Sequence, residues 1–307
     1  MESMSSIECF VRSAEAGSFS EAARRLGLTS AAVGKNVARL EAKLGVRLFQ
    51  RSTRSLTLTE AGERFLAEVS GGLAVIQSAV ANLASADGQP AGTLKISMGT
   101  GFGRTYIVPL LRDFLTRYPA ITPDWHFDNR RVDMIAEGFD AAIGGGFELP
   151  PGVVARALAP GHGVLVAAPD YFDTHAKLAS PAELTQHDGI FIRSPQTGRI
   201  RPWSLRNHSN EQAPISLRVR MTMSDPDAAC EAAQSGLGIA LVSMPNALRY
   251  LENGKLIRVL PDWYVDIGTL SLYFPAQKLL PTKTRVFVDY VVEHFRQEKF
   301  AKRFSAF

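Results

Sequence analysis

The chain has 307 residues, of which 46% are hydrophobic and 21% charged, and its formal net charge is +4. This length exceeds one ordinary core and predicts two or three compact units, while the balanced composition excludes a disordered or fibrous protein. The sequence starts without the features of a secretory signal, and its apolar runs are far shorter than the roughly 20 residues of a membrane span, so we expect a cytoplasmic protein with no membrane partner.

The first elements expected are two short helices. Apolar residues recur at the spacing of one buried helical stripe up to Gly17, which ends the first helix. Ser18 and Glu21 then form the S-x-x-E pattern of a capping box and predict the start of a second helix. Gly27 supplies the left-handed end of that helix.

Thr29 and Ser30 are suited to cap a third helix with two contrasting faces. The face expected to be buried carries Val33, Val37, Leu40 and Leu44. The opposite face carries Ala31, Gly34, Lys35 and Ala38, with Arg39 at its edge. A small-sided face lets a helix enter the major groove of DNA, where a lysine reaches base edges or phosphates. The alternative, a solvated helix with incidental lysines, seldom combines small residues and charges in this way.

A short hairpin with an arginine-bearing tip follows the third helix. Leu56-Thr57-Leu58 alternates as a strand does, and Arg51 and Arg54 precede it. Between residues 24 and 54 there are eight basic residues against one acidic residue, Glu41. Such a local excess of positive charge suits a polyanion, so we expect both arginines to contact phosphates or a minor groove beside the third helix.

A fourth helix is predicted from about Thr59, with apolar residues at alternating spacings of three and four. These are the a and d positions of a heptad. Because residues 84–92 have the composition of a linker, the helix has little of its own chain to pack on, and we expect dimerisation through this stripe. The alternative is an amphipathic helix that packs on its own domain. The stripe consists of Leu66, Val69, Leu73, Ile76, Val80 and Leu83.

Beyond the linker, strands alternate with helices, which is typical of α/β units around largely parallel sheets. The expected strands are 94–98, 125–127, 141–144, 153–158, 164–168, 190–193, 217–221, 239–242 and 270–274. Ligands of such sheets bind beyond the carboxyl ends of the strands. The loop 99–104 follows the first strand, precedes a helix expected from about Thr105, and lacks the glycine spacing of a dinucleotide-binding loop. A ligand-binding loop and a purely structural turn both remain open readings of it.

The run SFSEAARRLGLTSAAVGKNVARLEAKLGVRLFQRSTRSLTLTEAG, residues 18–62, resembles the N-terminal region of LysR-type transcriptional regulators, and the order of elements matches that family over essentially the whole chain. The resemblance implies a winged helix-turn-helix at 1–59, a linker and dimerisation helix with a hinge at 60–92, and an effector-binding domain at 93–307. That domain would consist of two Rossmann-like α/β lobes of the periplasmic-binding-protein type, with lobe I at about 93–161 and 269–307 and lobe II at about 162–268. Family members bind interrupted dyads in double-stranded DNA as homodimers or homotetramers.

The resemblance also implies site residues. Ser30, Ala31, Gly34 and Lys35 would face base edges, and because the family commonly has serine in place of Gly34, we expect reduced direct readout. The positions implied for the effector are Thr100, Phe102, Arg104, Gly145, Ser224 and Met244. The family often has arginine in place of Gly144, so Arg104 becomes the expected anion contact.

The sequence therefore predicts a sequence-specific DNA-binding regulator whose activity is modulated by a small-molecule effector. The alternatives are a DNA-binding module fused to an enzymatic or nucleotide-binding α/β domain, and an exported solute-binding protein. The sequence has no H-E-x-x-H, G-x-S-x-G or G-x-x-x-x-G-K-[ST] motif, and its six histidines are scattered. Its two cysteines, Cys9 and Cys230, are too few for a disulfide framework or a metal cage and are read as small buried hydrophobes. We therefore expect no enzymatic activity, no catalytic residue, no metal and no cofactor.

Overall fold

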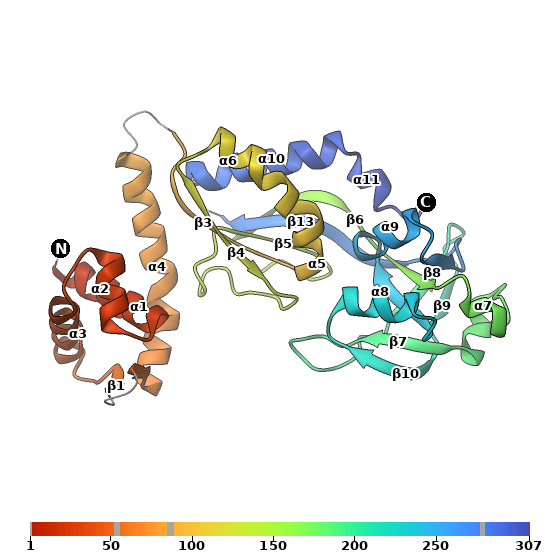
Figure 1. Ribbon diagram of the computed structural model, residues 1–307, viewed down its shortest axis with the longest axis horizontal. Helices are drawn as coiled ribbons and strands as arrows, with labels where there is room; N and C mark the ends of the chain where they lie inside the picture. The colour runs from red at the N-terminus through yellow and green to blue at the C-terminus, as the bar shows by residue number, and fades with distance from the viewer. Residues whose placement is uncertain (1, 52–55, 85–88, 277–279) are drawn as a thin grey trace. The chain divides into compact units, whose positions relative to one another are not determined.

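The computed structural model describes residues 2–51, 56–84, 89–276 and 280–307 (Figure 1). The chain divides into two compact units, one of Met1–Gly88 with Asp133–Phe139 and one of Gln89–Val132 with Asp140–Phe307. They are called the N-terminal unit and the C-terminal unit below. Within the described ranges, no helix is long and apolar enough to cross a membrane.

The N-terminal unit is helical, with one short hairpin. Its elements are α1 (Glu2–Ala16), α2 (Phe19–Leu26), α3 (Ser30–Leu44), β1 (Phe49–Arg51), β2 (Leu56–Leu58) and α4 (Glu60–Ala84). The strands β1 and β2 pair in antiparallel fashion, with Phe49 opposite Leu58, which confirms the predicted hairpin. Its tip, residues 52–55, lies outside the described residues.

The helix boundaries follow the caps predicted from the sequence. The hydroxyl of Ser18 accepts a hydrogen bond from the Glu21 amide at 3.4 Å, and that of Thr29 accepts one from the Ala32 amide at 3.2 Å. Each bond satisfies an amide that has no partner within its helix. Gly27 has a φ of 65° and ends α2 in the left-handed conformation.

Aromatic rings form the centre of the N-terminal unit. Phe10 of α1 is fully buried, and its ring centroid lies 5.3 Å from that of Phe49 and 5.4 Å from that of Phe65 in α4. The buried residues of α3 are Val33, Val37 and Leu40. The prediction that Leu44 is buried was wrong, since 42% of this residue is exposed. It is the last residue of α3, and the chain turns away at Gly45 in the left-handed conformation.

Backbone contacts fix the hairpin against α3 and α4. One carboxylate oxygen of Glu41 in α3 accepts hydrogen bonds from the amides of Leu48 and Phe49 at 2.8 and 3.1 Å. At Gly62 in α4, an added Cβ would lie 2.1 Å from the Leu48 carbonyl oxygen, so only glycine permits this close approach. The hairpin therefore keeps a defined position beside α3.

The C-terminal unit is built on a mixed sheet with the strand order β10-β7-β11-β6-β13-β5-β3-β4, and β12 pairs with β6. These strands are β3 (Gly92–Met98), β4 (Ile121–Phe127), β5 (Ala141–Gly144), β6 (Val153–Ala167), β7 (Asp188–Ile192), β10 (Arg218–Met223), β11 (Ile239–Ser243), β12 (Ile257–Val259) and β13 (Val265–Pro275). A separate hairpin is formed by β8 (Ser204–Arg206) and β9 (Gln212–Pro214). Pairing within β3–β4, β3–β5, β7–β10 and β7–β11 is parallel, whereas the described residues of β6 and β13 pair with each other, and with β5, β11 and β12, in antiparallel fashion. The sheet is therefore mixed and not largely parallel as the sequence predicted.

Two long strands connect two α/β lobes. Lobe I contains β3, β4 and β5, lobe II contains β7, β10 and β11, and β6 and β13 run through both (Figure 1). The segments 153–158 and 164–168 were predicted as two strands, but they belong to the single strand β6 apart from Ala168. The pairing of β6 with β13 is irregular between Asp266 and Thr269, and an added Cβ at Gly161 would lie 2.9 Å from the Gly268 carbonyl oxygen. The two strands thus pass side by side from one lobe to the other, and their backbones approach closely at Gly161 and Gly268.

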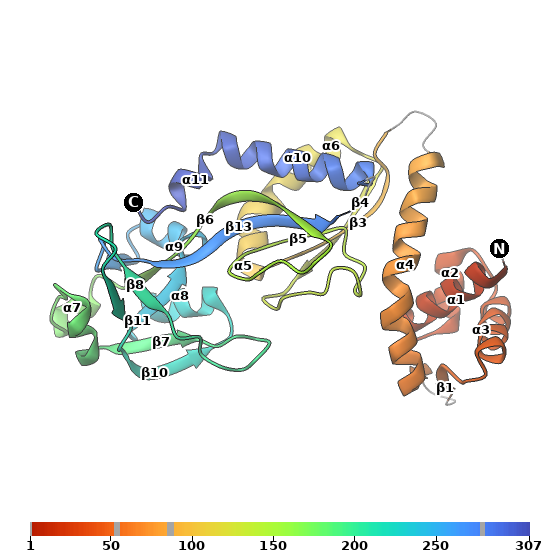
Figure 2. The same cartoon turned by 180° about the vertical axis from the view of Figure 1, so that it is seen from behind.

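Helices pack against the sheet in both lobes. In lobe I, α5 (Thr100–Phe102) continues through a π-helical turn (Gly103–Ile107) and a 3₁₀ turn (Val108–Leu110) into α6 (Leu111–Arg117). The helical segment therefore starts at Thr100, five residues before the predicted start at Thr105. The helix α10 (Thr282–Gln297) lies beside α6 (Figure 2), where the ring of Phe114 is 5.6 Å from that of Phe287. The remaining helices are α7 (Tyr171–Thr174), a 3₁₀ helix (Pro181–Gln186), α8 (Pro226–Gln234), α9 (Met244–Glu252) and α11 (Phe300–Arg303).

Candidate functional site

The helix α3 presents a small and basic face to solvent. Ser30, Ala31, Lys35 and Arg39 are exposed and Gly34 is partly exposed, while the opposite face fills the core. Apart from its chain neighbours and the backbone of its own helix, no atom of the described residues lies within 4 Å of the place where a Cβ at Gly34 would be. Packing within the described chain therefore gives no reason for glycine at this helical position, where it costs about 0.5–1 kcal/mol relative to alanine.

The positive charge around α3 is partly compensated at α2. Arg24 and Arg25 form ion pairs with Glu21 at 2.8 and 3.0 Å. Hydrogen bonds from these guanidinium groups lower the pKa of Glu21 to about 2, and the bond from Arg24 has the larger effect. The Glu21 carboxylate thus pairs with the two arginines. The predicted capping box had this carboxylate accept a hydrogen bond from a backbone amide at the start of α2. Lys35 and Arg39 have no such ion pair within the described residues, so their charge remains available on the exposed face.

The two arginines predicted for the hairpin can be placed only in part. Arg51 is the last residue of β1 and pairs with Leu56 of β2, but its side chain lies outside the described residues. Arg54 lies wholly outside the described residues. Their contacts with DNA stay predictions.

Part of the apolar stripe of α4 packs against the core of the N-terminal unit. Leu73 is only 5% exposed and belongs to the core cluster of the N-terminal unit, against which Leu66 and Val69 also pack. The expectation that this helix has little of its own chain to pack on is therefore wrong for its first half. Ile76 is 44% exposed, and the side chains of Val80 and Leu83 are outside the description. Dimerisation through the stripe stays a prediction.

A cavity of about 360 Å³ lies between the two lobes of the C-terminal unit. Lobe I contributes Asn129, which follows β4, and Gly145 and Gly146, which follow β5. At Gly145 an added Cβ would lie 2.4 Å from the Thr269 carbonyl oxygen, so this turn packs directly on the backbone of β13. Most of the wall comes from lobe II and is apolar, including Phe191, Trp203, Ile215, Leu217, Leu241 and Ile267. The polar side chains in the wall include Arg193, Ser194, Arg201, Ser224, Ser243 and Asn246.

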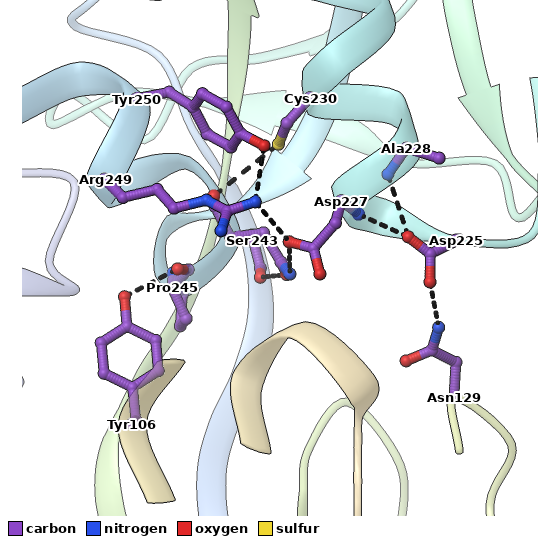
Figure 3. Close-up of polar contacts among 11 residues, drawn as sticks. Tyr106, Asn129, Asp225, Asp227, Ala228, Cys230, Ser243, Pro245, Arg249 and Tyr250 are labelled. Carbon is purple, nitrogen blue, oxygen red and sulfur yellow. Dashed lines mark hydrogen bonds and ion pairs between the residues drawn. The ribbon is translucent and has the colours of Figure 1, made fainter. Parts of the chain in front are cut away.

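A chain of hydrogen bonds connects the lobes at the edge of this cavity (Figure 3). The amide of Thr100 donates to the side-chain oxygen of Asn129 at 3.2 Å, and the Asn129 amide group donates to Asp225 at 3.0 Å. The other oxygen of Asp225 caps α8, accepting from the amides of Asp227 and Ala228 at 2.9 Å. Because both carboxylate oxygens have donors, this charge is already compensated within the chain.

A second contact between the lobes involves Tyr106. Its hydroxyl donates to the Pro245 carbonyl oxygen at 2.7 Å (Figure 3). Burial raises the pKa of Tyr106 above its ordinary value, so the hydroxyl keeps its proton. Nearby, an added Cβ at Gly101 would lie 1.7 Å from a carboxylate oxygen of Asp227, which shows how closely α5 approaches α8. The two lobes are thus held in one arrangement by specific short contacts.

The structure brings together only some of the residues predicted for the effector. Gly145 and Ser224 line the cavity. Thr100, Phe102, Arg104 and Met244 are not among its lining residues. Phe102 packs on Tyr106 with ring centroids 5.2 Å apart, Arg104 is exposed, and Met244 is only 5% exposed. Effector contacts of these four residues stay predictions and are not supported by the cavity lining.

Arg193, Arg201 and Trp203 of the cavity wall were not predicted from the sequence. Arg201 and Trp203 lie between β7 and β8, where no helical or strand periodicity marks a function. The adjacency of basic and aromatic residues in Arg201-Pro202-Trp203 was the one local signal available. Within the described part of the chain, no group of three or more His, Cys, Asp and Glu side chains is arranged to hold a metal ion.

Two family models match the chain. The model described as "LysR substrate binding domain" matches residues 87–296, and the one described as "Bacterial regulatory helix-turn-helix protein, lysR family" matches residues 4–63. Among curated proteins, the transcriptional regulator PgrR of Escherichia coli K12 is 31% identical over 289 residues, which are 94% of this chain and 96% of the relative. The transcriptional activator TtdR of E. coli O6:K15:H31 is 30% identical over 268 residues, covering 87% of this chain and 86% of the relative.

Solved structures give the same result for the whole architecture. The full-length structure of AphB, a virulence activator of Vibrio cholerae and a member of the LTTR family, matches with a TM-score of 0.62 and 27% identity and covers 94% of this chain and 98% of that chain. CrgA, a LysR-type transcriptional regulator from Neisseria meningitidis, matches with a TM-score of 0.59 and 27% identity and covers 96% of this chain and 98% of that chain.

Proposed function

The chain belongs to the LysR family of transcriptional regulators, and we propose that it binds operator DNA through the exposed face of α3 and the hairpin β1–β2. We further propose that it does so as a homodimer or homotetramer, and that an effector in the cavity between the lobes modulates this binding. PgrR is named as a transcriptional regulator and TtdR as a transcriptional activator, and we propose no enzymatic activity for this chain.

The observation that carries the DNA-binding proposal is the unpartnered face of α3. Ala31, Gly34 and Lys35 lie on it, and the glycine has no packing role within the described chain. Keeping glycine in a helix at a cost in stability is understandable where a second surface must approach closely. The basic side chains of Lys35 and Arg39 beside it provide the charge that phosphates attract.

The proposal is tested with Lys35→Ala in the full-length protein. A DNA site is first selected from random fragments with the unaltered protein, and the affinities of protein and variant for it are then compared by fluorescence anisotropy at two salt concentrations. If Lys35 contacts a base edge, we expect about a 5- to 100-fold loss on the selected site, which corresponds to roughly 1–3 kcal/mol. If it contacts a phosphate, the salt slope should fall by about one unit instead.

The matched control is Lys255→Ala, which removes the same charge from an exposed position in the C-terminal unit. Its affinity for the selected DNA should equal that of the unaltered protein. Equal losses in both variants would mean that only overall charge matters, and no loss in Lys35→Ala would remove α3 from the proposed DNA-binding surface.

The effector part of the proposal rests on the cavity between lobes that are tied by a few hydrogen bonds. A ligand shifts the arrangement of the lobes only if it binds one arrangement more tightly than another. The Asn129–Asp225 and Tyr106–Pro245 hydrogen bonds each join one lobe to the other, so they are among the bonds that such a shift would break and form again. Screening small metabolites for ligands that change both the melting temperature and the DNA affinity of the full-length protein tests this part.

A further inference from the structure

We infer that the effector is a small organic anion with an apolar, ring-sized body, and that Arg201 binds its negative group. This inference rests on the proposed function, because it assigns a chemical class to the ligand of the same cavity. It also moves the anion contact away from Arg104, which the sequence favoured and which the cavity does not include.

The charge of the cavity wall selects the sign of the ligand. Its described lining residues include Arg193 and Arg201 but no aspartate, glutamate or lysine. A cationic ligand would meet two positive charges with no carboxylate in the wall to compensate its own charge. Asp225, which caps α8, already accepts hydrogen bonds from three donors and is not part of the lining. Glu148 and Asp266 line a neighbouring pocket that shares Arg201, but neither belongs to this wall. An anion is therefore the ligand whose charge the wall compensates.

The shape and polarity of the wall select the body of the ligand. Aromatic and aliphatic side chains make up most of the lobe II surface, with Phe191, Trp203 and Ile215 among them. The volume of about 360 Å³ is more than twice the roughly 150 Å³ of an apolar cavity that holds benzene. A substituted ring or a fused pair of rings fits this space. A sugar or another uniformly polar molecule would leave most of its hydroxyl groups against apolar side chains without partners.

The geometry of Arg201 leaves it free to bind a carboxylate. One guanidinium nitrogen donates to the Gly146 carbonyl oxygen at 3.0 Å, and the guanidinium group lies over the Trp203 ring at 4.0 Å from its centroid. A guanidinium group has five N–H donors in a planar fork, so the bond to Gly146 leaves donors for a bidentate carboxylate. Stacking on the tryptophan fixes the plane of that fork.

The position of Arg201 also connects binding with regulation. Arg201 belongs to the segment between β7 and β8 of lobe II, whereas Gly146 follows β5 of lobe I. An anion that takes up donors of Arg201 therefore acts at a hydrogen bond between the lobes. This provides the difference in affinity between lobe arrangements that a switch requires.

The experiment compares matched ligands on the full-length protein. Phenylacetate and indole-3-acetate are titrated by calorimetry and by tryptophan fluorescence, alongside their neutral amides, phenethylamine and acetate. We expect saturable binding of at least one of the two acids, binding of its amide at least about tenfold weaker, and no binding of the amine or of acetate. A tenfold difference corresponds to about 1.4 kcal/mol, close to the lower end of the roughly 1.5–3 kcal/mol of a hydrogen bond to a charged group.

Variants identify the anion contact. Arg201→Gln should weaken binding of the acid about 10- to 100-fold while its amide binds unchanged, and Arg201→Lys should restore part of the affinity because it keeps the charge without the fork. The control is Arg199→Gln, which removes the same charge from an exposed position that does not line the cavity. It should bind the acid as the unaltered protein does.

The outcomes separate this inference from the proposed function. If a metabolite alters DNA affinity and quenches tryptophan fluorescence, but its binding depends neither on a negative group nor on Arg201, the anion inference is overturned and the regulator remains. Binding of neither acid, or equal losses for Arg201→Gln and Arg199→Gln, also overturns the inference. If no compound of any charge alters the DNA affinity of a protein that binds its selected site, the proposed effector function fails as well.

Discussion

Single residues determine where the helices of the N-terminal unit begin and end. Ser18 and Thr29 each accept a hydrogen bond from an amide in the first turn of a helix, and Gly27 ends α2 in the left-handed conformation. The exposed face of α3 lies outside these caps and outside the core, so a change of one residue on that face should alter DNA binding without loss of the fold.

Gly34 provides the sharpest test at this scale. Gly34→Ala should raise the free energy of unfolding by about 0.5–1 kcal/mol, because alanine favours a helix and no described atom outside the backbone of α3 lies within 4 Å of the new Cβ. The same methyl group should weaken binding to the selected DNA by about tenfold, since it stands on the face that approaches the bases. Urea denaturation and fluorescence anisotropy measure the two effects.

Gly72→Ala is the matched control for Gly34→Ala. Gly72 is also helical, and no described atom outside its chain neighbours and the backbone of α4 lies within 4 Å of its added Cβ. This variant should gain similar stability and keep full DNA affinity. A Gly34→Ala protein that binds the selected DNA as tightly as the control would contradict the assignment of this face.

The two cysteines should be inert in the folded protein. Cys230 is fully buried, and burial raises the pKa of its thiol to about 12, so at pH 8 almost none of it is the reactive thiolate. Cys9 is only 1% exposed. With a chromogenic disulfide reagent at pH 8 we expect slow reaction in native buffer and rapid reaction of both thiols in denaturant. Prompt labelling of one thiol in the native protein would show that its core opens readily.

Some strands were predicted correctly from the sequence and others were not, whereas the helix caps were predicted correctly. The strands β3, β5 and β11 were found because each is a short apolar run bounded by turn residues. The strand β6 was predicted as two because Pro160, Gly161 and Gly163 interrupt its apolar pattern. Its continuity depends on pairing with β13, about a hundred residues later in the chain, and no local pattern carries that information. The short strands β8, β9 and β12 were missed for the same reason.

The helix α4 should have two separable functions along its length. Leu73→Ala should lower the free energy of unfolding of the N-terminal unit by about 2–5 kcal/mol, because it opens a cavity in that unit's own core. Ile76→Lys changes an exposed residue and should alter that stability by less than about 1 kcal/mol, but it should dissociate the proposed dimer. Urea denaturation and sedimentation velocity on the full-length protein distinguish the effects. If Ile76→Lys sediments as the unaltered protein does, the stripe does not form the dimer contact.

At the scale of the C-terminal unit, the sequence predicted two lobes but not what holds them together. The contacts between the lobes join residues far apart in the chain, such as Asn129 with Asp225 and Tyr106 with Pro245. Each of these residues is unremarkable in its local sequence. The cavity follows from the resulting arrangement, which explains why only Gly145 and Ser224 of the predicted effector residues line it.

Tyr106→Phe tests whether the arrangement of the lobes governs effector binding. The variant keeps the ring, which packs 5.2 Å from Phe300 and 5.1 Å from Phe304, and removes only the hydroxyl that donates to Pro245. Tyr106 does not line the cavity, so a change in ligand affinity must come through the lobes. Loss of one hydrogen bond disfavours the observed arrangement by about 0.5–1.5 kcal/mol. We therefore expect a ligand that binds this arrangement to bind roughly 2- to 10-fold more weakly in calorimetry.

The pH dependence of this effect has a definite sign. Burial raises the pKa of Tyr106, so its hydroxyl remains a protonated donor from pH 6 to pH 9 and the Tyr106–Pro245 bond persists throughout. The ratio of the affinities of the unaltered protein and Tyr106→Phe should consequently stay constant over this range. An unchanged affinity in Tyr106→Phe would mean that this bond does not bias the lobes. A ratio that falls towards one as the pH rises to 9 would mean that the hydroxyl ionises and that Tyr106 is more accessible to water than its burial indicates.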